Sequence, residues 1–163
     1  MYSRVEGAAD GLWVQNASGV LAQAAEVAAG FDGSVWPPVG ADAVDLSGRY
    51  QLMAESGYVY GPVFQGLRGV WRRGEEVFAE VVLPEQVEDA AAFGLHPALL
   101  DAALQAISLV DPDGLGERLL PFSWNEVSLH AGGASVLRVR LVTCGVDAVS
   151  LACLLYTSPS PRD

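Results

Sequence analysis

The segment 96–105, HPALLDAALQ, is a short apolar run with a single acidic residue in its middle. Apolar residues recur along it and just beyond it at i, i+3, i+4 and i+7, namely Leu100, Ala103, Leu104 and Ile107. At about 100° per residue these side chains form one stripe, which we expect to face a core. Gly94 and Pro97 give the helix a defined start. The spacing therefore predicts a buried helix that the rest of the chain packs around.

The acidic residue in this run is Asp101, which shares the adjacent stripe with Gln105 and Ser108. A carboxylate close to a buried face loses water, and desolvation raises the pKa of an acid until it holds a proton near neutral pH. Asp101 is therefore a candidate proton donor. The alternative is a solvated helix residue tied to Gln105 by an i,i+4 contact, because most perturbed acids are not catalytic.

Composition limits the class of protein. The 163 residues fit one domain, and 51% hydrophobic residues are enough for a sizeable core. The chain has neither a run of about eighteen apolar residues nor the apolar segment of a signal peptide, which predicts a cytoplasmic protein without a membrane partner. A net charge of −11 argues against nucleic acid as a partner. Cys144 and Cys153 lack metal-ligand spacing, which favours two ordinary thiols.

The first half of the chain predicts one strand, a linker, a short helix and a hairpin, in that order. Residues 12–21 are typical of a strand whose partner lies upstream of the chain, and residues 23–44, rich in Ala, Gly and Pro, of a linker. Residues 46–57 predict a short helix capped by Ser47 and ended by Gly57. Residues 67–74 and 75–84 predict a hairpin with a tight turn.

The second half predicts strands after the acidic helix. Residues 85–94 are loop-like or weakly helical, and residues 111–117 form a Gly/Asp-rich loop. Residues 119–131, 134–144 and 147–152 alternate well enough for strands with one buried face. Residues 153–163, CLLYTSPSPRD, turn to Ser and Pro, which cannot continue a ladder. We interpret them as a non-native tail resembling translated adapter sequence, the alternative being a native flexible tail.

Several motifs occur together in a fixed order: WVQNASG at 13–19, YGP at 60–62, FQGL at 64–67, WRRG at 71–74, HPALLD at 96–101, LPFSW at 120–124 and LRVR at 137–140. In order and spacing they resemble the dehydratase domain of modular type I polyketide synthases. The likeness runs from about residue 2 to residue 152. It is far more specific than any one of the short motifs.

The resemblance implies an α+β hotdog fold, in which an antiparallel sheet wraps around a central helix. The family has two such halves, so this chain would be an incomplete double hotdog. Residues 1–22 would end the first half, 23–44 would link, 45–152 would form the second half and 153–163 the non-native tail. The helix around Asp101 would be the central helix of the second half.

The family removes water from a β-hydroxyacyl chain on the phosphopantetheine arm of an acyl carrier protein, giving an α,β-unsaturated thioester. A histidine takes the α-proton and an aspartic acid protonates the departing hydroxyl, which requires two groups with separated pKa values. By this resemblance Asp101 is the acid, Gln105 orients its carboxyl, and Tyr60 donates a hydrogen bond to the leaving group. Without the resemblance, the residues alone favour a core tyrosine at a turn for Tyr60.

The resemblance also implies substrate-binding positions at Gly61, Pro62, Leu95, His96, Pro121 and Phe122. The last two would line a tunnel, the alternative being ordinary strand packing. The family's histidine base has a glycine four residues later and a proline five beyond that, which neither His96 nor His130 has. His96 is expected to fix the helix entry, and His130 to be an exposed or hydrogen-bonded strand residue.

The chain is thus predicted to carry the acid without the base, and to have little or no activity alone. No metal and no directly bound cofactor are expected. Predicted partners are the acyl carrier protein, the other synthase domains including the first hotdog half, and a second copy of the parent synthase. Candidate docking arginines are Arg68, Arg72 and Arg73, or Arg138 and Arg140 on one strand face; the alternative is solvated edge arginines.

Two other functions remain open from the sequence. One is a non-catalytic hotdog module that binds acyl chains or holds dimer contacts. The other is a stand-alone hotdog thioesterase or hydratase that acts on coenzyme A thioesters as a dimer. An upstream histidine motif would favour the synthase dehydratase, and its replacement would favour the non-catalytic module.

Overall fold

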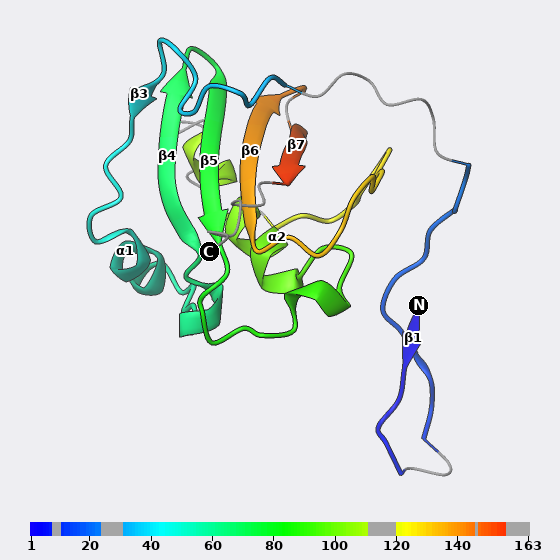
Figure 1. Ribbon diagram of the computed structural model, residues 1–163. Coiled ribbons are helices and arrows are strands. Elements are labelled where there is room, and N and C mark those ends of the chain that lie inside the picture. The colour runs from blue at the N-terminus through cyan, green and yellow to red at the C-terminus, as the bar shows by residue number, and fades with distance from the viewer. Residues whose placement is uncertain (8–10, 24–30, 111–119, 146, 156–163) are drawn as a thin grey trace, which may run out of the picture.

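The computed structural model describes residues 1–7, 11–23, 31–110, 120–145 and 147–155 (Figure 1). Its centre is a five-stranded antiparallel sheet in the order β3-β4-β5-β6-β7. The strands are β3 Asp42–Ala43, β4 Leu67–Arg73, β5 Glu76–Val82, β6 Val136–Thr143 and β7 Val149–Leu155. The helix α2, Pro97–Leu104, packs against one face of this sheet (Figure 1). A curved antiparallel sheet around a helix is the hotdog arrangement predicted from the sequence.

The predicted hairpin is confirmed as β4 and β5, which pair from Arg73↔Glu76 onward. Gly74 in its turn has φ 59, a left-handed conformation that glycine adopts without steric cost. The strands predicted at 134–144 and 147–152 are confirmed as β6 and β7. β7 also includes residues 153–155, so the first part of the predicted tail pairs with β6, as in Val139↔Cys153.

The main core lies between the sheet and α2. Alternate residues of the three central strands point toward the helix and are buried, because successive side chains of a strand face opposite sides. They are Val70 on β4, Val77, Ala79 and Val81 on β5, and Leu137, Val139 and Leu141 on β6. The single buried face expected for the strand at 134–144 is therefore present on β6.

The predicted buried stripe of α2 is confirmed for Ala103 and wrong for the full burial of Leu100 and Leu104. The buried residues are Ala98, Leu99, Ala102 and Ala103, whereas Leu100 and Leu104 are half-buried. The alanines let the helix approach the sheet closely. A side chain at Gly66 would collide with the helix and with the neighbouring strand. A Cβ there would lie 2.8 Å from the carbonyl oxygen of Val82 and 3.1 Å from the Cβ of Ala102. Small side chains permit this close packing, which is why three of the four buried residues of α2 are alanines.

The described part of the predicted linker, from residue 31 onward, packs against the outer face of the sheet. The ring centroid of Trp36 lies 5.6 Å from that of Trp71 and 6.1 Å from that of Phe78. The guanidinium carbon of Arg138 lies 5.3 Å from the ring centroid of Trp36. Residues 42–43 of the linker also form the edge strand β3. Part of the predicted connecting segment therefore packs on the sheet, because isolated aromatic side chains anchor a segment without producing any periodicity.

The short helix predicted at 46–57 is confirmed as α1, Arg49–Glu55. Gly57, with φ 93, follows its end as expected. The predicted cap is wrong: Gly48 is the N-cap residue, with no side-chain cap. The backbone nitrogen of Ser47 instead donates to Asp45 Oδ1 at 2.9 Å, forming a turn before the helix. Single 3₁₀ turns occur at Pro62–Phe64 (η1), Ala90–Ala92 (η2) and Ile107–Leu109 (η3).

Two strand predictions are wrong in extent or existence. Only Val14–Gln15 of residues 12–21 forms a strand, β2, and its partner is β1, Tyr2–Ser3, within the chain. This small hairpin lies apart from the main sheet (Figure 1). Residues 120–131 form no strand and are exposed. Both edges of β6 are already paired with β5 and β7, which leaves that alternating segment no place beside it. The loop predicted at 111–117 lies outside the described residues.

The candidate docking arginines are largely engaged within the fold. Arg73 and Arg140 both pair with Glu76, at 2.8 and 2.6 Å. Arg72, on the opposite side of β4 from Arg73, donates to the carbonyl oxygen of Val110 at 3.3 Å. Arg68, Arg72 and Arg73 therefore do not form one patch. Arg138 and Arg140 share a strand face as expected, and Arg138 donates to the carbonyl oxygen of Gly33 at 2.7 Å.

Replacing Glu76 by glutamine is expected to remove a pH-dependent contribution to the free energy of unfolding. Hydrogen bonds from Arg73, and then from Arg140, hold the pKa of Glu76 below its ordinary value of 4.5. Its contribution is therefore fully present above pH 4.5 and disappears as pH falls through the lower folded-state pKa. Because both arginines are solvent-accessible, the wild type should exceed E76Q by at most about 1 kcal/mol at pH 7. Urea unfolding at pH 7 and pH 3 measures this; a difference that grows toward pH 3 would contradict it.

No helix among the described residues is long and apolar enough to cross a membrane.

Candidate active site

Asp101 lies in the middle of α2 with a half-buried side chain. Its Oδ2 accepts a hydrogen bond from Nε2 of Gln105 at 3.0 Å. Gln105 is only 4% exposed, and it is the buried polar residue of the described core. The i,i+4 contact expected from the sequence is therefore present, and it is made inside the protein rather than in solvent.

The Gln105 amide also bonds to groups from two other segments. Its Nε2 also donates to the carbonyl oxygen of Phe64 at 2.8 Å, and its Oε1 accepts from the hydroxyl of Tyr50 at 3.0 Å. The Tyr50 oxygen in turn accepts from the backbone nitrogen of Leu67 at 3.0 Å. The segments around η1 and α1 thus meet the acid-bearing helix at this amide.

Tyr60 joins the same cluster from the segment before η1. Its ring packs edge-on against that of Tyr50, with centroids 6.2 Å apart and planes at 72°. Its carbonyl oxygen accepts from Nε2 of Gln65 at 2.9 Å, which holds the backbone in place. Burial, followed by the negative charge of Asp101, raises the pKa of Tyr60. The phenol therefore keeps its proton at neutral pH and can act as a hydrogen-bond donor.

The entry to α2 is set by His96. Its Nδ1 accepts a hydrogen bond from the backbone nitrogen of Ala98 at 3.2 Å, which makes it the N-cap. Its Nε2 lies 3.6 Å from Asp89 Oδ1, and its ring contacts Phe93 with centroids 4.9 Å apart. The expected role in the helix entry is confirmed. Leu95, the preceding residue, is half-buried against the core.

The remaining predicted substrate-binding residues divide into two groups. Gly61 is the N-cap residue of η1 and Pro62 is its first residue, so both lie in the chain between Tyr60 and Phe64, which belong to the cluster. Pro121 and Phe122 lie in the exposed segment 120–133, and the Phe122 side chain is fully solvent-accessible. The structure does not bring these two residues into the cluster. His130, expected on a strand, lies exposed in the same irregular segment.

Sequence reasoning did not identify Tyr50 or Arg49. Nη2 of Arg49 donates to the carbonyl oxygen of Gln105 at 3.2 Å and to Ser108 Oγ, and burial lowers its pKa. The available signal was the helical spacing of Tyr50 and Met53, which are both half-buried. A tyrosine on the inner face of a short helix needs a partner for its hydroxyl group. That partner, however, lies 55 residues away in the chain.

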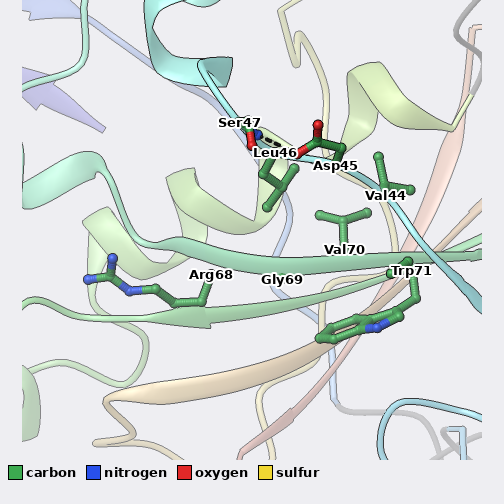
Figure 2. Close-up of a pocket in the computed structure, with 9 residues that line it drawn as sticks. Val44, Asp45, Leu46, Ser47, Arg68, Gly69, Val70 and Trp71 are labelled. Carbon is green, nitrogen blue, oxygen red and sulfur yellow. Dashed lines mark hydrogen bonds between the residues drawn. The ribbon is translucent and has the colours of Figure 1, made fainter.

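Two surface depressions lie away from this cluster. One, of about 280 Å³, is lined by residues 43–47 and 68–71, beside the edge of β4; Figure 2 shows Arg68 and Trp71 on the strand and the Asp45–Ser47 turn across from it. The other, about 320 Å³, lies on the outer face between Phe31, Arg73 and Arg140. No group of three His, Cys, Asp or Glu in the described part of the chain is arranged to hold a metal ion.

The site therefore holds a carboxyl fixed by a buried amide, next to a tyrosine whose phenol stays protonated, on the central helix of a hotdog. The fold is therefore that of a hotdog domain, with an acid–amide pair on its central helix. The chain belongs to the polyketide synthase dehydratase family: residues 28–147 match the family model described as the polyketide synthase dehydratase N-terminal domain.

Individual relatives agree with this assignment. The chain is 52% identical over 160 residues to the polyketide synthase GfsA of Streptomyces halstedii, covering 95% of this chain and 2% of that protein. It is 49% identical over 152 residues to the mycoketide-CoA synthase of Mycobacterium tuberculosis, covering 93% of this chain and 4% of that protein. The chain therefore spans only a few per cent of the length of these relatives.

Solved structures share the fold. The erythromycin dehydratase matches with a TM-score of 0.78 and 43% identity, over 91% of this chain and 52% of that one. The bifunctional dehydratase-cyclase domain of ambruticin biosynthesis matches with a TM-score of 0.80 and 40% identity, over 94% of this chain and 55% of that one. The present chain corresponds to about half of each solved domain.

Proposed function

We propose that this chain supplies the acid side of a dehydratase that removes water from a β-hydroxyacyl thioester. The observation that carries the proposal is the Asp101 carboxyl held by Gln105 beside Tyr60, in a chain of the dehydratase family. In this proposal residues 45–152 form the second hotdog half, after the end of a first half at 1–22 and a connecting segment at 23–44.

The proposed reaction is a proton transfer at each end of one carbon–carbon bond. Asp101 gives its proton to the β-hydroxyl group, the carbon–oxygen bond breaks, and water leaves. A base removes the α-proton, and the electrons of the broken carbon–hydrogen bond form the α,β double bond. Tyr60 donates a hydrogen bond to the departing oxygen and lowers its developing charge. Gln105 holds the carboxyl in the donating orientation.

The base in this proposal is a histidine outside the chain. His96 is committed to the N-cap of α2 through Nδ1, and His130 is exposed in an irregular segment. Neither has the family's spacing to glycine and proline. An acid without its base leaves the α-proton in place, and loss of one general acid–base partner costs on the order of 10²-fold to 10⁴-fold in rate.

The proposed substrate arrives on the phosphopantetheine arm of an acyl carrier protein, with no cofactor bound directly by this chain. Proposed partners are that carrier protein, the other domains of the synthase and a second copy of the parent synthase, in the cytoplasm. The length of the relatives supports a multidomain parent, since each matches this chain over a small part of its sequence. Gly61, Pro62, Leu95 and His96 border the path proposed for the acyl chain.

The isolated chain is expected to show little or no turnover of a β-hydroxyacyl thioester. The measurement is a steady-state assay of the α,β-unsaturated product, with the chain alone and with the complete parent dehydratase. Turnover by the chain alone that matches the complete domain and is lost in D101N would contradict the missing base. Absence of turnover in the complete dehydratase would instead favour a non-catalytic acyl-binding module.

A further inference from the structure

We propose that Tyr50 is a positioning residue that orients the Gln105 amide and, through it, the carboxyl of Asp101. The inference rests on the proposed function, because it assigns the acid role to Asp101. It adds a residue that makes no direct contact with the carboxyl, on a helix that the sequence does not associate with the site. The hydrogen bonds of three segments carry it, each with a donor and an acceptor that their chemistry determines.

The hydrogen bond between Leu67 and Tyr50 has only one possible direction. A backbone N–H can only donate, so the oxygen of Tyr50 is the acceptor in their 3.0 Å contact. The hydroxyl hydrogen is therefore left for the other partner, Oε1 of Gln105, at 3.0 Å. Burial raises the pKa of Tyr50, which keeps that hydrogen in place. The oxygen end of the amide is thus fixed toward Tyr50.

The nitrogen end of the amide is fixed in the same way. Phe64 presents a carbonyl oxygen, which can only accept, and takes one Nε2 hydrogen at 2.8 Å. The other Nε2 hydrogen goes to Oδ2 of Asp101 at 3.0 Å. A 180° rotation of the amide would place its oxygen against the Phe64 carbonyl and its nitrogen against the Tyr50 donor. Both contacts would then be lost.

The consequence for Asp101 is that its two oxygens differ. Oδ2 accepts from Gln105, so the transferable proton of the neutral acid lies on Oδ1. The direction of proton donation is therefore set by a chain of bonds that begins at the backbone of β4. Water cannot easily replace a link of this chain, because Gln105 is only 4% exposed. Arg49, the neighbour of Tyr50, fixes α1 to the end of α2 through the Gln105 carbonyl.

The first test uses NMR on the full chain. Both side-chain amide protons of Gln105 should exchange with solvent at least about tenfold more slowly than those of exposed Gln86, because both are hydrogen-bonded in a buried site. In Y50F this protection should fall toward the Gln86 value, while in Y58F, a matched loss of one hydroxyl on the same segment, it should remain. Unprotected Gln105 protons in the wild type would overturn the proposal without any variant.

The second test uses the complete parent dehydratase. Y50F should lower kcat on the order of 10-fold to 100-fold with KM changed less than about twofold, because the acyl chain still binds while the acid is misaligned. Y58F should match the wild type. In a Q105L background, Y50F should have no further effect on kcat, since the amide through which Tyr50 acts is gone.

The outcomes separate this inference from the proposed function. Loss of Gln105 protection in Y50F with the expected fall in kcat supports both. Full turnover in Y50F, unchanged Gln105 protection, or an additive effect in the Q105L background overturns the positioning role. Absence of turnover in the wild-type parent dehydratase overturns the proposed function and with it the acid role that the inference assumes. The NMR result would then report only on the hydrogen-bond chain.

Discussion

Replacing Asp101 by asparagine is expected to lower kcat of the complete dehydratase by about 10²-fold to 10⁴-fold. An asparagine amide has the shape of the carboxyl but no acidic proton to give to the β-hydroxyl group. Its oxygen can still accept from Nε2 of Gln105, the bond that Oδ2 of Asp101 accepts at 3.0 Å. The substitution therefore removes the proton donor with little change to the packing of α2. Steady-state kinetics of β-hydroxyacyl thioester dehydration measure the effect.

The matched control for this prediction is D42N. Asp42 is exposed on the edge strand β3, so the same substitution there should leave kcat within about twofold of the wild type. Circular dichroism spectra of D101N and of the wild type should coincide. A D101N domain that is folded and turns over at the wild-type rate would remove Asp101 from the acid role, and the proposed mechanism with it.

Replacing Leu99 by alanine is expected to lower the free energy of unfolding by about 2–5 kcal/mol. Leu99 is 0% exposed and lies in the core between α2 and the sheet. The neighbouring buried helix residues are alanines, which are too small to fill the space that the lost methyl groups would leave. The cavity would therefore persist. Urea unfolding of the chain, followed by circular dichroism, measures the change.

Leu52 provides the control for cavity formation, because the same substitution there leaves no void. It lies on the outer side of α1 and is 61% exposed, so L52A should change the free energy of unfolding by no more than about 0.5 kcal/mol. Equal losses for L99A and L52A would mean that α2 is not packed against the sheet. The position of Asp101 would then lose its structural support.

Local patterns predicted the elements that pair with their sequence neighbours. The β4–β5 hairpin was predictable because a short turn joins its strands and Gly74 suits the left-handed turn conformation. α2 was predictable from its start at Pro97, but not its buried face. Helical periodicity does not distinguish a small apolar residue from a large one. In the structure Ala102 is buried and Leu104 is only half-buried, because the helix lies close to Gly66. Sequence spacing does not contain that distance.

Part of the candidate site was also predictable. Asp101 and Gln105 are one helical turn apart, and an i,i+4 contact follows from helix geometry alone. Tyr60 required the family resemblance, since a tyrosine before a Gly-Pro pair has no chemistry of its own. Tyr50 was not identified, because its hydroxyl meets Gln105 across 55 residues of chain. Pro121 and Phe122, predicted as tunnel residues, lie in the exposed segment instead.

The amino-acid sequence by itself determined the family, the central helix with its acid, the hairpin and the two last strands, because each is encoded in neighbouring residues. Only the tertiary structure decided which face of the helix is buried, that residues 31–44 cover the sheet, and that Tyr50 anchors the amide beside Asp101. These features depend on distances between segments far apart in the chain. Such distances are set by the packing of all the side chains together, which no local pattern records.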